Sequence, residues 1–174
     1  MHLKGEKGFT LVEVIVVAAI IAILAGILVP MIFSQIDEAK LSRAKGDIRS
    51  LSSAIYAFRK DVGQWPACSG ATIMFGQGTS AAAAIVALGY DNSGTTMFED
   101  HLMDANTCYG DMWKGPYFGS VSADPWGNPY FINAANFGVA NQPVLLLSAG
   151  PNGAFETGPA ATTPVGDDIG IRVK

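Results

Sequence analysis

Histidine is scarce in this chain of 174 residues, and its scarcity restricts the chemistry available to the protein. Only two histidines, His2 and His101, are present, too few for a histidine-rich metal site. A catalytic triad would depend on His101 alone, and no nucleophile motif accompanies it. There is also no phosphate-binding glycine loop ending in Lys-Ser or Lys-Thr. The sequence therefore predicts a protein that is not an enzyme and that has no nucleotide site of its own.

Charged residues are absent from Val14 to Phe33, and this stretch is almost wholly aliphatic. About 20 such residues in a helix span the hydrocarbon core of a bilayer, which is about 30 Å thick. A secretory signal peptide has an apolar core of only about 7 to 15 residues. The sequence therefore predicts a membrane-spanning helix. Glu13 lies at the beginning of this run, where a carboxylate is costly, so it requires a functional explanation.

The six residues from Gly8 to Glu13 (Gly-Phe-Thr-Leu-Val-Glu) resemble the prepilin signature of type IV pilins and type II secretion pseudopilins. In that family a prepilin peptidase cleaves after the glycine, and the new N-terminal residue becomes N-methylated. The resemblance implies that residues 1–8 are a leader peptide and that Phe9 is the mature N-terminus. It also implies that the subunits assemble into a helical homopolymer.

A free α-amine at Phe9 would offer Glu13 a counter-ion. Such an amine has an ordinary pKa of about 7.7 to 8.0 and is largely cationic at neutral pH. An unpaired charge in an apolar environment is expensive, so pairing is expected. Within one helix the amine of Phe9 can reach Glu13 of the same chain, whereas the resemblance implies pairing with a neighbouring subunit that sets the filament register. The alternative is a plain single-pass anchor with an isolated glutamate.

The helical pattern continues beyond the apolar run. Apolar residues recur at three- and four-residue steps, which places them on one helix face, and Gly63 with Pro66 predicts the end of the helix. We therefore expect one helix over residues 9–62, with a membrane-spanning half at 9–33 and an amphipathic half after it. The recurring residues are Ile48, Leu51, Ile55, Phe58 and Val62.

Pro30 lies inside this expected helix. A proline removes one backbone donor and clashes with the preceding turn, so a kink or local melting is expected there. The family resemblance implies a segment that loosens on filament assembly. An ordinary proline kink in a membrane helix is equally compatible with the residue.

Residues 63–174 are expected to form a globular head rich in glycine and small polar residues. We expect short helices at 80–88, capped by Ser80 and ended by Gly89, and from a capping box of Thr96 and Glu99 through about Asp104. Short strands are expected at 130–133, 144–148 and 169–173. A long helix that covers the single buried face of a small antiparallel sheet gives an α+β, pilin-like fold.

Two blocks of the head resemble the major (G-type) pseudopilin of type II secretion systems: Trp113 to Tyr117, and Asp124 to Tyr130 with its Asp-Pro and Gly-Asn turns. The resemblance implies a pseudopilus subunit that drives protein export together with minor pseudopilins, an assembly platform and an ATPase. A major type IV pilin, which builds surface fibres for adhesion or motility, is the alternative. A membrane-anchored binding module that never polymerises is a third class. The region from Cys68 to Met112 is longer than the family pattern.

The stretch from Leu147 to Gly153, followed by Gly166 to Ile169, resembles a loop that binds calcium in the family. Calcium takes six to eight oxygen ligands in irregular geometry. The resemblance implies acidic ligands at Asp167 and Asp168, and places Asn152 where an aspartate is usual. A solvated acidic turn is the alternative.

Two cysteines, Cys68 and Cys108, lie in the head. If the head is exported to an oxidising compartment, a disulfide between them would contribute about 4 kcal/mol for a loop of this length. Two buried free thiols are the alternative. A metal site made from these cysteines and His101 would lack a fourth ligand.

Charge is unevenly divided along the chain. Residues 37–60 carry six basic and three acidic residues, whereas residues 61–174 carry ten acidic and three basic ones. The acidic outer part argues against nucleic acid as a partner and suits subunits whose stems attract neighbouring heads. Basic residues flank both ends of the apolar run, so the positive-inside rule gives little contrast. A single-pass inner-membrane protein with a periplasmic head, which later forms a periplasmic or extracellular filament, is therefore an implication of the resemblance.

Overall fold

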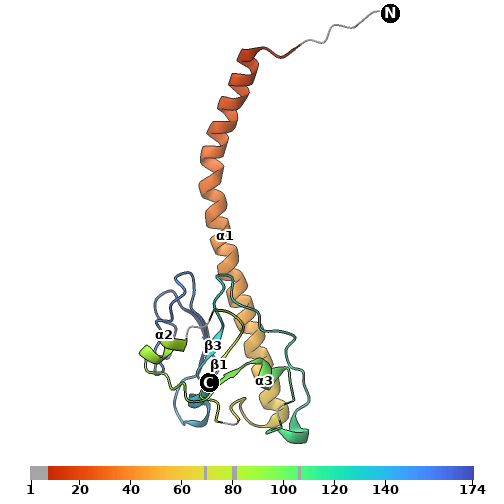
Figure 1. Cartoon of the computed structure of the whole chain (residues 1–174), viewed down its shortest axis with the longest axis vertical. Helices are drawn as coiled ribbons and strands as arrows, with labels where there is room; N and C mark the ends of the chain where they lie inside the picture. The colour runs from red at the N-terminus through yellow and green to blue at the C-terminus, as the bar shows by residue number, and fades with distance from the viewer. Residues whose placement is uncertain (1–7, 69, 80–81, 106) are drawn as a thin grey trace, which may run out of the picture. The chain divides into compact units, whose positions relative to one another are not determined.

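The computed structural model describes residues 8–68, 70–79, 82–105 and 107–174. Residues 1–7 of the expected leader lie outside the described residues, as does Ser80, the first residue of the short helix expected at 80–88. The chain divides into two compact units, the first ending at Ala39 and the second running from Lys40 to Lys174. Figure 1 shows the elements of both units in chain order.

Helix α1 (Leu11–Val62) is the long helix that the sequence predicts. Its first part exposes a nearly continuous series of aliphatic side chains and is long and apolar enough to cross a membrane. The helix ends as expected: Gly63 adopts a positive φ of 78° and its N–H donates to the carbonyl of Arg59 at 2.9 Å. The chain remains helical on both sides of Pro30, so the expected local melting is not present in the single chain. Loosening on filament assembly stays a prediction.

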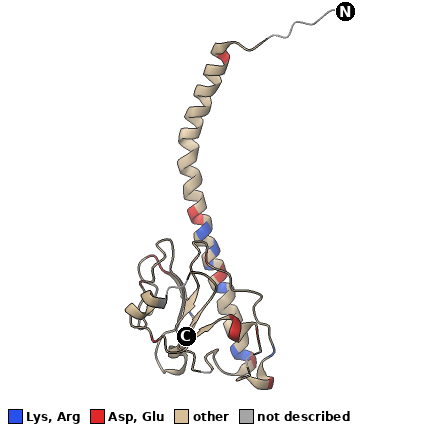
Figure 2. Cartoon of the chain, viewed as in Figure 1, with Lys and Arg blue, Asp and Glu red and all other residues tan. Residues whose placement is uncertain are grey.

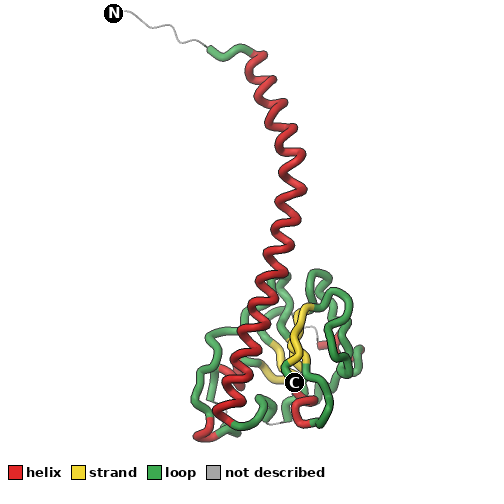
Figure 3. Tube along the Cα trace, turned by 180° about the vertical axis from the view of Figure 1, so that it is seen from behind, coloured by secondary structure: helices red, strands yellow, loops and turns green. Residues whose placement is uncertain are grey.

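The predicted apolar stripe of α1 is the helical side of the main core. Ile48, Leu51, Ile55 and Phe58 are each at most 2% exposed and pack against buried residues of the sheet. Burying one such side chain contributes about 1.5 to 3 kcal/mol, so the stripe fixes the helix on the sheet. Figure 3 shows the strands beside this part of the helix.

The sheet has five strands in the order β2-β1-β3-β4-β5. Strands β3, β4 and β5 form near the predicted positions and pair antiparallel, and β1 pairs antiparallel with β3. Strands β1 and β2 pair in parallel, so the sheet is mixed and the expectation of a wholly antiparallel sheet is wrong. The bounds are β1 (Ile73–Phe75), β2 (Thr95–Met97), β3 (Phe131–Ile132), β4 (Leu145–Ser148) and β5 (Ile169–Arg172).

The parallel pair follows from the long region between the two cysteines. Parallel strands require a crossover connection, and the segment between β1 and β2 supplies one that contains helix α2 (Ala82–Ala87). Ile85 of α2 packs with Phe131 and Leu147 in a second buried cluster on the other face of the sheet. The sheet is therefore buried on both faces, and not on one as expected.

The expected capping box at Thr96 and Glu99 is wrong. Thr96 lies in β2, and helix α3 (Glu99–Leu102) begins after Phe98, which makes no side-chain cap. The carboxylate of Asp100 instead accepts a hydrogen bond from the N–H of Met97 at 2.9 Å. Tertiary pairing of β2 with β1 thus overrides the local signal. Two 3-10 helices follow, η1 (Gly110–Met112) and η2 (Ala134–Gly138).

The corner from Asp124 to Tyr130 is as compact as the sequence predicts. Asp124 is buried, and its Oδ1 accepts hydrogen bonds from the N–H groups of Trp126 (3.0 Å) and Asn128 (2.8 Å). Ser148 donates to its Oδ2 at 2.6 Å, which ties the corner to β4. Tyr130 donates to Asp47 at 2.9 Å, so the same corner is also fixed to α1.

Candidate functional site

The N-terminal segment places the expected processing and register residues at the start of α1. Gly8 and Phe9 are exposed and precede the helix, and Phe9 is 89% exposed. Glu13 lies in the first turn, beside Phe9, Val14 and Val17 in a shallow apolar groove of about 610 Å³. A peptidase cutting after Gly8 would therefore meet non-helical, exposed backbone.

In this uncleaved chain the partner of Glu13 is Thr10. The carboxylate Oε2 accepts hydrogen bonds from the Thr10 N–H at 2.8 Å and the Thr10 hydroxyl at 2.7 Å. The N–H of Glu13 donates to the Thr10 Oγ at 3.3 Å, which completes a reciprocal capping box. The nitrogen of Phe9 is still part of a peptide bond, so its pairing with Glu13 stays a prediction for the processed subunit. Thr10 was not predicted as a site residue, although Thr-x-x-Glu before an apolar run is the pattern that indicates this capping box.

Cys68 and Cys108 are joined by a disulfide, with their Cα atoms 6.3 Å apart. The bond links the segment just after α1 to the loop that carries Tyr109, whose ring packs edge-on against Phe58 at 4.8 Å. It therefore connects the 68–112 region to the end of the long helix.

His101 is part of the buried support of this region. It is 1% exposed, its Nδ1 lies 2.6 Å from the Tyr109 hydroxyl and its Nε2 lies 3.1 Å from the Thr96 hydroxyl. Burial lowers the pKa of His101 and raises the pKa of Tyr109 to about 12, so both groups are neutral at neutral pH. Both ring nitrogens of His101 therefore have hydroxyl partners, and the residue supports the packing of this region.

The acidic loop before β5 is organised by its own carboxylates. Asp168 is 8% exposed, and its Oδ2 accepts hydrogen bonds from the N–H groups of Thr157 (2.7 Å) and Glu156 (2.9 Å). The Oδ2 of Asp167 accepts from the N–H of Asn152 at 2.9 Å. Asn152 in turn accepts from the N–H of Ala154 at 2.6 Å through its side-chain oxygen, in a tight turn. The three predicted ligands therefore lie in one hydrogen-bonded loop.

Each aspartate of this loop has a second oxygen that is buried and unpartnered. The Oδ1 atoms of Asp167 and Asp168 accept no hydrogen bond. Burial raises the pKa of Asp168 above its ordinary value, against the lowering effect of its bonds to Thr157 and Glu156. In the described part of the chain no three acidic, histidine or cysteine side chains converge. Carboxylate oxygens are the ligand type that calcium prefers, and these two have no other partner.

Comparison with known proteins assigns the N-terminal segment and part of the head to known families. The model of the prokaryotic N-terminal methylation motif matches residues 3–29, and that of the type II secretion system (T2SS), protein G, matches residues 100–163. The type II secretion system core protein G of Pseudomonas aeruginosa is 30% identical over 153 residues, which cover 88% of this chain and 89% of that protein. The chain belongs to the family of type II secretion system core protein G.

Other relatives agree with the protein G assignment. The core protein G of Aeromonas hydrophila is 30% identical over 139 residues, covering 79% of this chain and 80% of that protein. The core protein G of Escherichia coli is 28% identical over 156 residues, which cover 87% of this chain and 86% of that protein. The comparison with solved structures gives no significant match. The protein G assignment confirms the pseudopilin resemblance over that to surface pilins.

The family models cover the sites unequally. The methylation motif contains Gly8, Phe9, Thr10 and Glu13, whereas residues 30–99 match neither model. Asp167 and Asp168 lie just beyond the matched part of the head. A family model thus covers the N-terminal site, whereas Asp167 and Asp168 are supported by their local structure alone.

Proposed function

We propose that this chain is the major subunit of a type II secretion pseudopilus. The observation that carries the proposal is the coincidence of the methylation motif with an exposed, apolar α1 that begins at Thr10 and Glu13. A helix that exposes aliphatic side chains over about six turns requires lipid, other such helices, or both in succession. Membership of the protein G family favours the secretion filament over the surface pilus.

The proposed cycle begins with a single-pass inner-membrane protein whose head lies in the periplasm. A prepilin peptidase cleaves between Gly8 and Phe9, and the new amine becomes the counter-ion of Glu13. Subunits then leave the bilayer and pack their apolar helices together, with the platform and ATPase of the secretion machine supplying the work. Minor pseudopilins complete the filament, which pushes exported proteins outward.

Deletion of the gene should abolish export of the secreted proteins while leaving surface fibres unaffected. Mass spectrometry of the mature chain should show an N-terminal Phe9 carrying one methyl group, because the leader is removed before assembly. The wild-type gene supplied in trans is the control. If the deletion removes surface fibres but leaves secretion normal, the chain is the subunit of a type IV pilus and not of a pseudopilus.

We also propose that Asp167 and Asp168 bind calcium. The support is their pair of buried oxygens without hydrogen-bond donors. A bound cation would place positive charge against Asp168, whose ionised form is disfavoured by burial, and it would hold the loop against β5. The ionised form of Asp168 is the one that binds, so protons and calcium compete for this site.

Calcium should raise the melting temperature of residues 40–174 at pH 7 and raise it less as the pH falls. At about 100 times the dissociation constant the expected gain is about 2.7 kcal/mol, or roughly 5 to 15 °C. The pKa of Asp168 is raised in the folded protein, so protonation stabilises the calcium-free fold. This contribution is complete below the unfolded pKa and is lost as the pH rises through the folded value. Melting curves with calcium and with a chelator, across pH, measure both effects.

Asp168→Asn is the matched variant for this experiment. Asparagine keeps a side-chain oxygen for the N–H groups of Glu156 and Thr157, so the loop retains its hydrogen bonds. The variant should lose the response to calcium and be at least as stable as the wild type in chelator. A wild-type protein that melts identically in calcium and chelator would leave the acidic loop as a solvated turn.

A further inference from the structure

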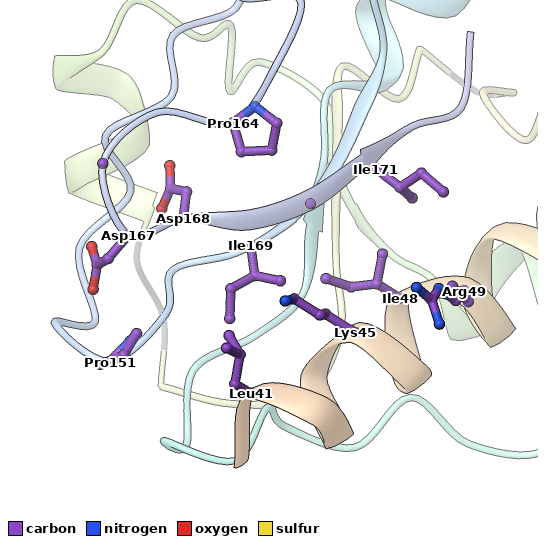
Figure 4. Close-up of a pocket in the computed structure, with 12 residues that line it drawn as sticks. Leu41, Lys45, Ile48, Arg49, Pro151, Pro164, Asp167, Asp168, Ile169 and Ile171 are labelled. Atoms are coloured by element: carbon purple, nitrogen blue, oxygen red, sulfur yellow. The ribbon is translucent and has the colours of Figure 1, made fainter. Parts of the chain in front are cut away.

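A groove of about 540 Å³ separates the beginning of α1 in the second unit from β5. Its floor is apolar, formed by Leu41 and Ile48 of α1 and by Ile169 and Ile171 of β5. Lys45 and Arg49 line it from the helix, one turn apart. Figure 4 shows Lys45 extending from α1 toward Ile169. We call this feature the α1–β5 groove.

Among the residues that the structure describes, Lys45 and Arg49 form no ion pair with an acidic side chain. The ion pair that the described part of α1 does form joins Arg43 to Asp47 at 3.5 Å. Lys45 and Arg49 are exposed. Asp167 and Asp168 lie at one end of the groove, where their Oδ2 atoms accept hydrogen bonds from loop N–H groups and their Oδ1 atoms are the ones proposed to bind calcium. Two unpaired cations beside an apolar floor suit a ligand that combines a carboxylate with an apolar side chain.

A surface of that chemistry lies elsewhere on the same chain. Residues 68–112 contain five acidic residues and neither lysine nor arginine. At the end of this region η1 has no buried residue, and it presents the exposed Asp111 next to Met112, which is 49% exposed. Figure 2 shows the basic residues of α1 and the acidic residues of α3 and η1 within the second unit.

The groove and η1 cannot meet within one molecule. Tyr109, which directly precedes η1, packs on Phe58 at 4.8 Å. Phe58 lies about 20 Å along the helix from Lys45, at a rise of about 1.5 Å per residue. Every copy therefore carries both surfaces at opposite ends of the second unit. Contact between two different surfaces of identical subunits is heterologous, and it repeats as an open filament unless the rotation closes a ring.

We propose that the α1–β5 groove binds η1 of a second copy of this chain. Asp111 pairs with Lys45 and Arg49, and Met112 covers the apolar floor. The contact gives the filament an end-to-end specificity that the apolar helices alone do not supply. It rests on the proposed function, because it requires that the chain polymerises.

Cross-linking of the full-length chain in secreting cells tests this contact. Lys45→Cys and Asp111→Cys in one chain, treated with a short thiol cross-linker, should give a ladder of multimers, whereas each single variant should not. Lys60→Cys with Asp111→Cys is the matched control, since Lys60 is also an exposed lysine of α1 but lies at the same end as η1. That control pair should give no ladder.

Charge reversal supplies the second arm. Lys45→Glu should lower the yield of sheared filaments about tenfold or more, and Asp111→Lys in the same chain should restore it. Normal filaments with neither a ladder nor a charge effect would overturn the docking proposal and leave the polymer standing. Cross-linking of the Lys45→Cys variant to a chain of another mass would overturn the second copy as occupant. A wild-type chain that forms no filament would overturn the proposed function, and this contact with it.

Discussion

Glu13→Ala is expected to abolish filament formation while leaving the chain inserted in the membrane. In the proposed cycle, processing frees the amine of Phe9, and in a filament of packed apolar helices the charges of this amine and of Glu13 would require each other. Removing the carboxylate leaves a cation without a counter-ion, so filament yield should fall to below about one-hundredth of wild type. Electron microscopy of sheared material and membrane fractionation measure the two outcomes.

Glu13→Gln separates the charge from the capping box. Glutamine still accepts hydrogen bonds from Thr10, so the start of α1 is preserved, but it carries no negative charge to balance an ammonium group. We expect it to fail like alanine. Glu38→Ala, which removes the same side chain from α1 beyond the apolar run, should assemble normally. Filaments of normal yield from the glutamine variant would show that the charge of Glu13 does not set the register.

The long helix was predictable because its signals are local. Twenty uncharged residues, a three-and-four spacing that begins at Ile48, and Gly63 all act within a few turns of the helix. The structure buries the predicted stripe and ends the helix at Val62. The Asp124 corner was predictable for the same reason, since its turns and its hydrogen bonds to Trp126 and Asn128 are short-range.

The 68–112 region was not predictable to the same extent, because its structure depends on distant partners. Strands β1 and β2 are three residues each, too short for a periodic signal, and their pairing depends on α2 covering the second face of the sheet. The same capping pattern therefore failed at Thr96, which pairs with Met74, and is satisfied at Thr10, where no strand competes. A local rule holds only where tertiary pairing leaves the backbone free.

The acidic loop was predictable in part, because its residue types are a local signal but the burial of its oxygens depends on the fold. Its residue types pointed to Asp167 and Asp168, but only the structure shows that one oxygen of each is buried without a donor. The groove beside it brings α1 and β5 together from sequence positions more than a hundred residues apart, so no spacing in the sequence could reveal it.

Breaking the Cys68–Cys108 disulfide is expected to destabilise the head by about 4 kcal/mol, because the bond closes a loop with a sequence separation of 40 residues. This corresponds to a loss of roughly 10 to 25 °C in melting temperature. The closed loop contains β1, α2, β2 and α3, which supply one edge of the sheet and the cover of its second face. Thermal melting of residues 40–174 with and without reductant measures the effect.

Cys68→Ala with Cys108→Ala provides the control for this loss. The double variant should melt near the reduced wild type and be insensitive to reductant. Tyr109 anchors the same loop to α1 by its ring contact with Phe58 and its hydrogen bond with His101. Without the disulfide, Tyr109 is the main anchor of this loop, so we expect the 68–112 region to unfold locally before the rest of the head. Amide hydrogens of β1 and β2 should then exchange faster than those of β4 and β5. Uniform exchange across the sheet would mean that the disulfide stabilises the head as a whole, and that Tyr109 does not define a separate unit.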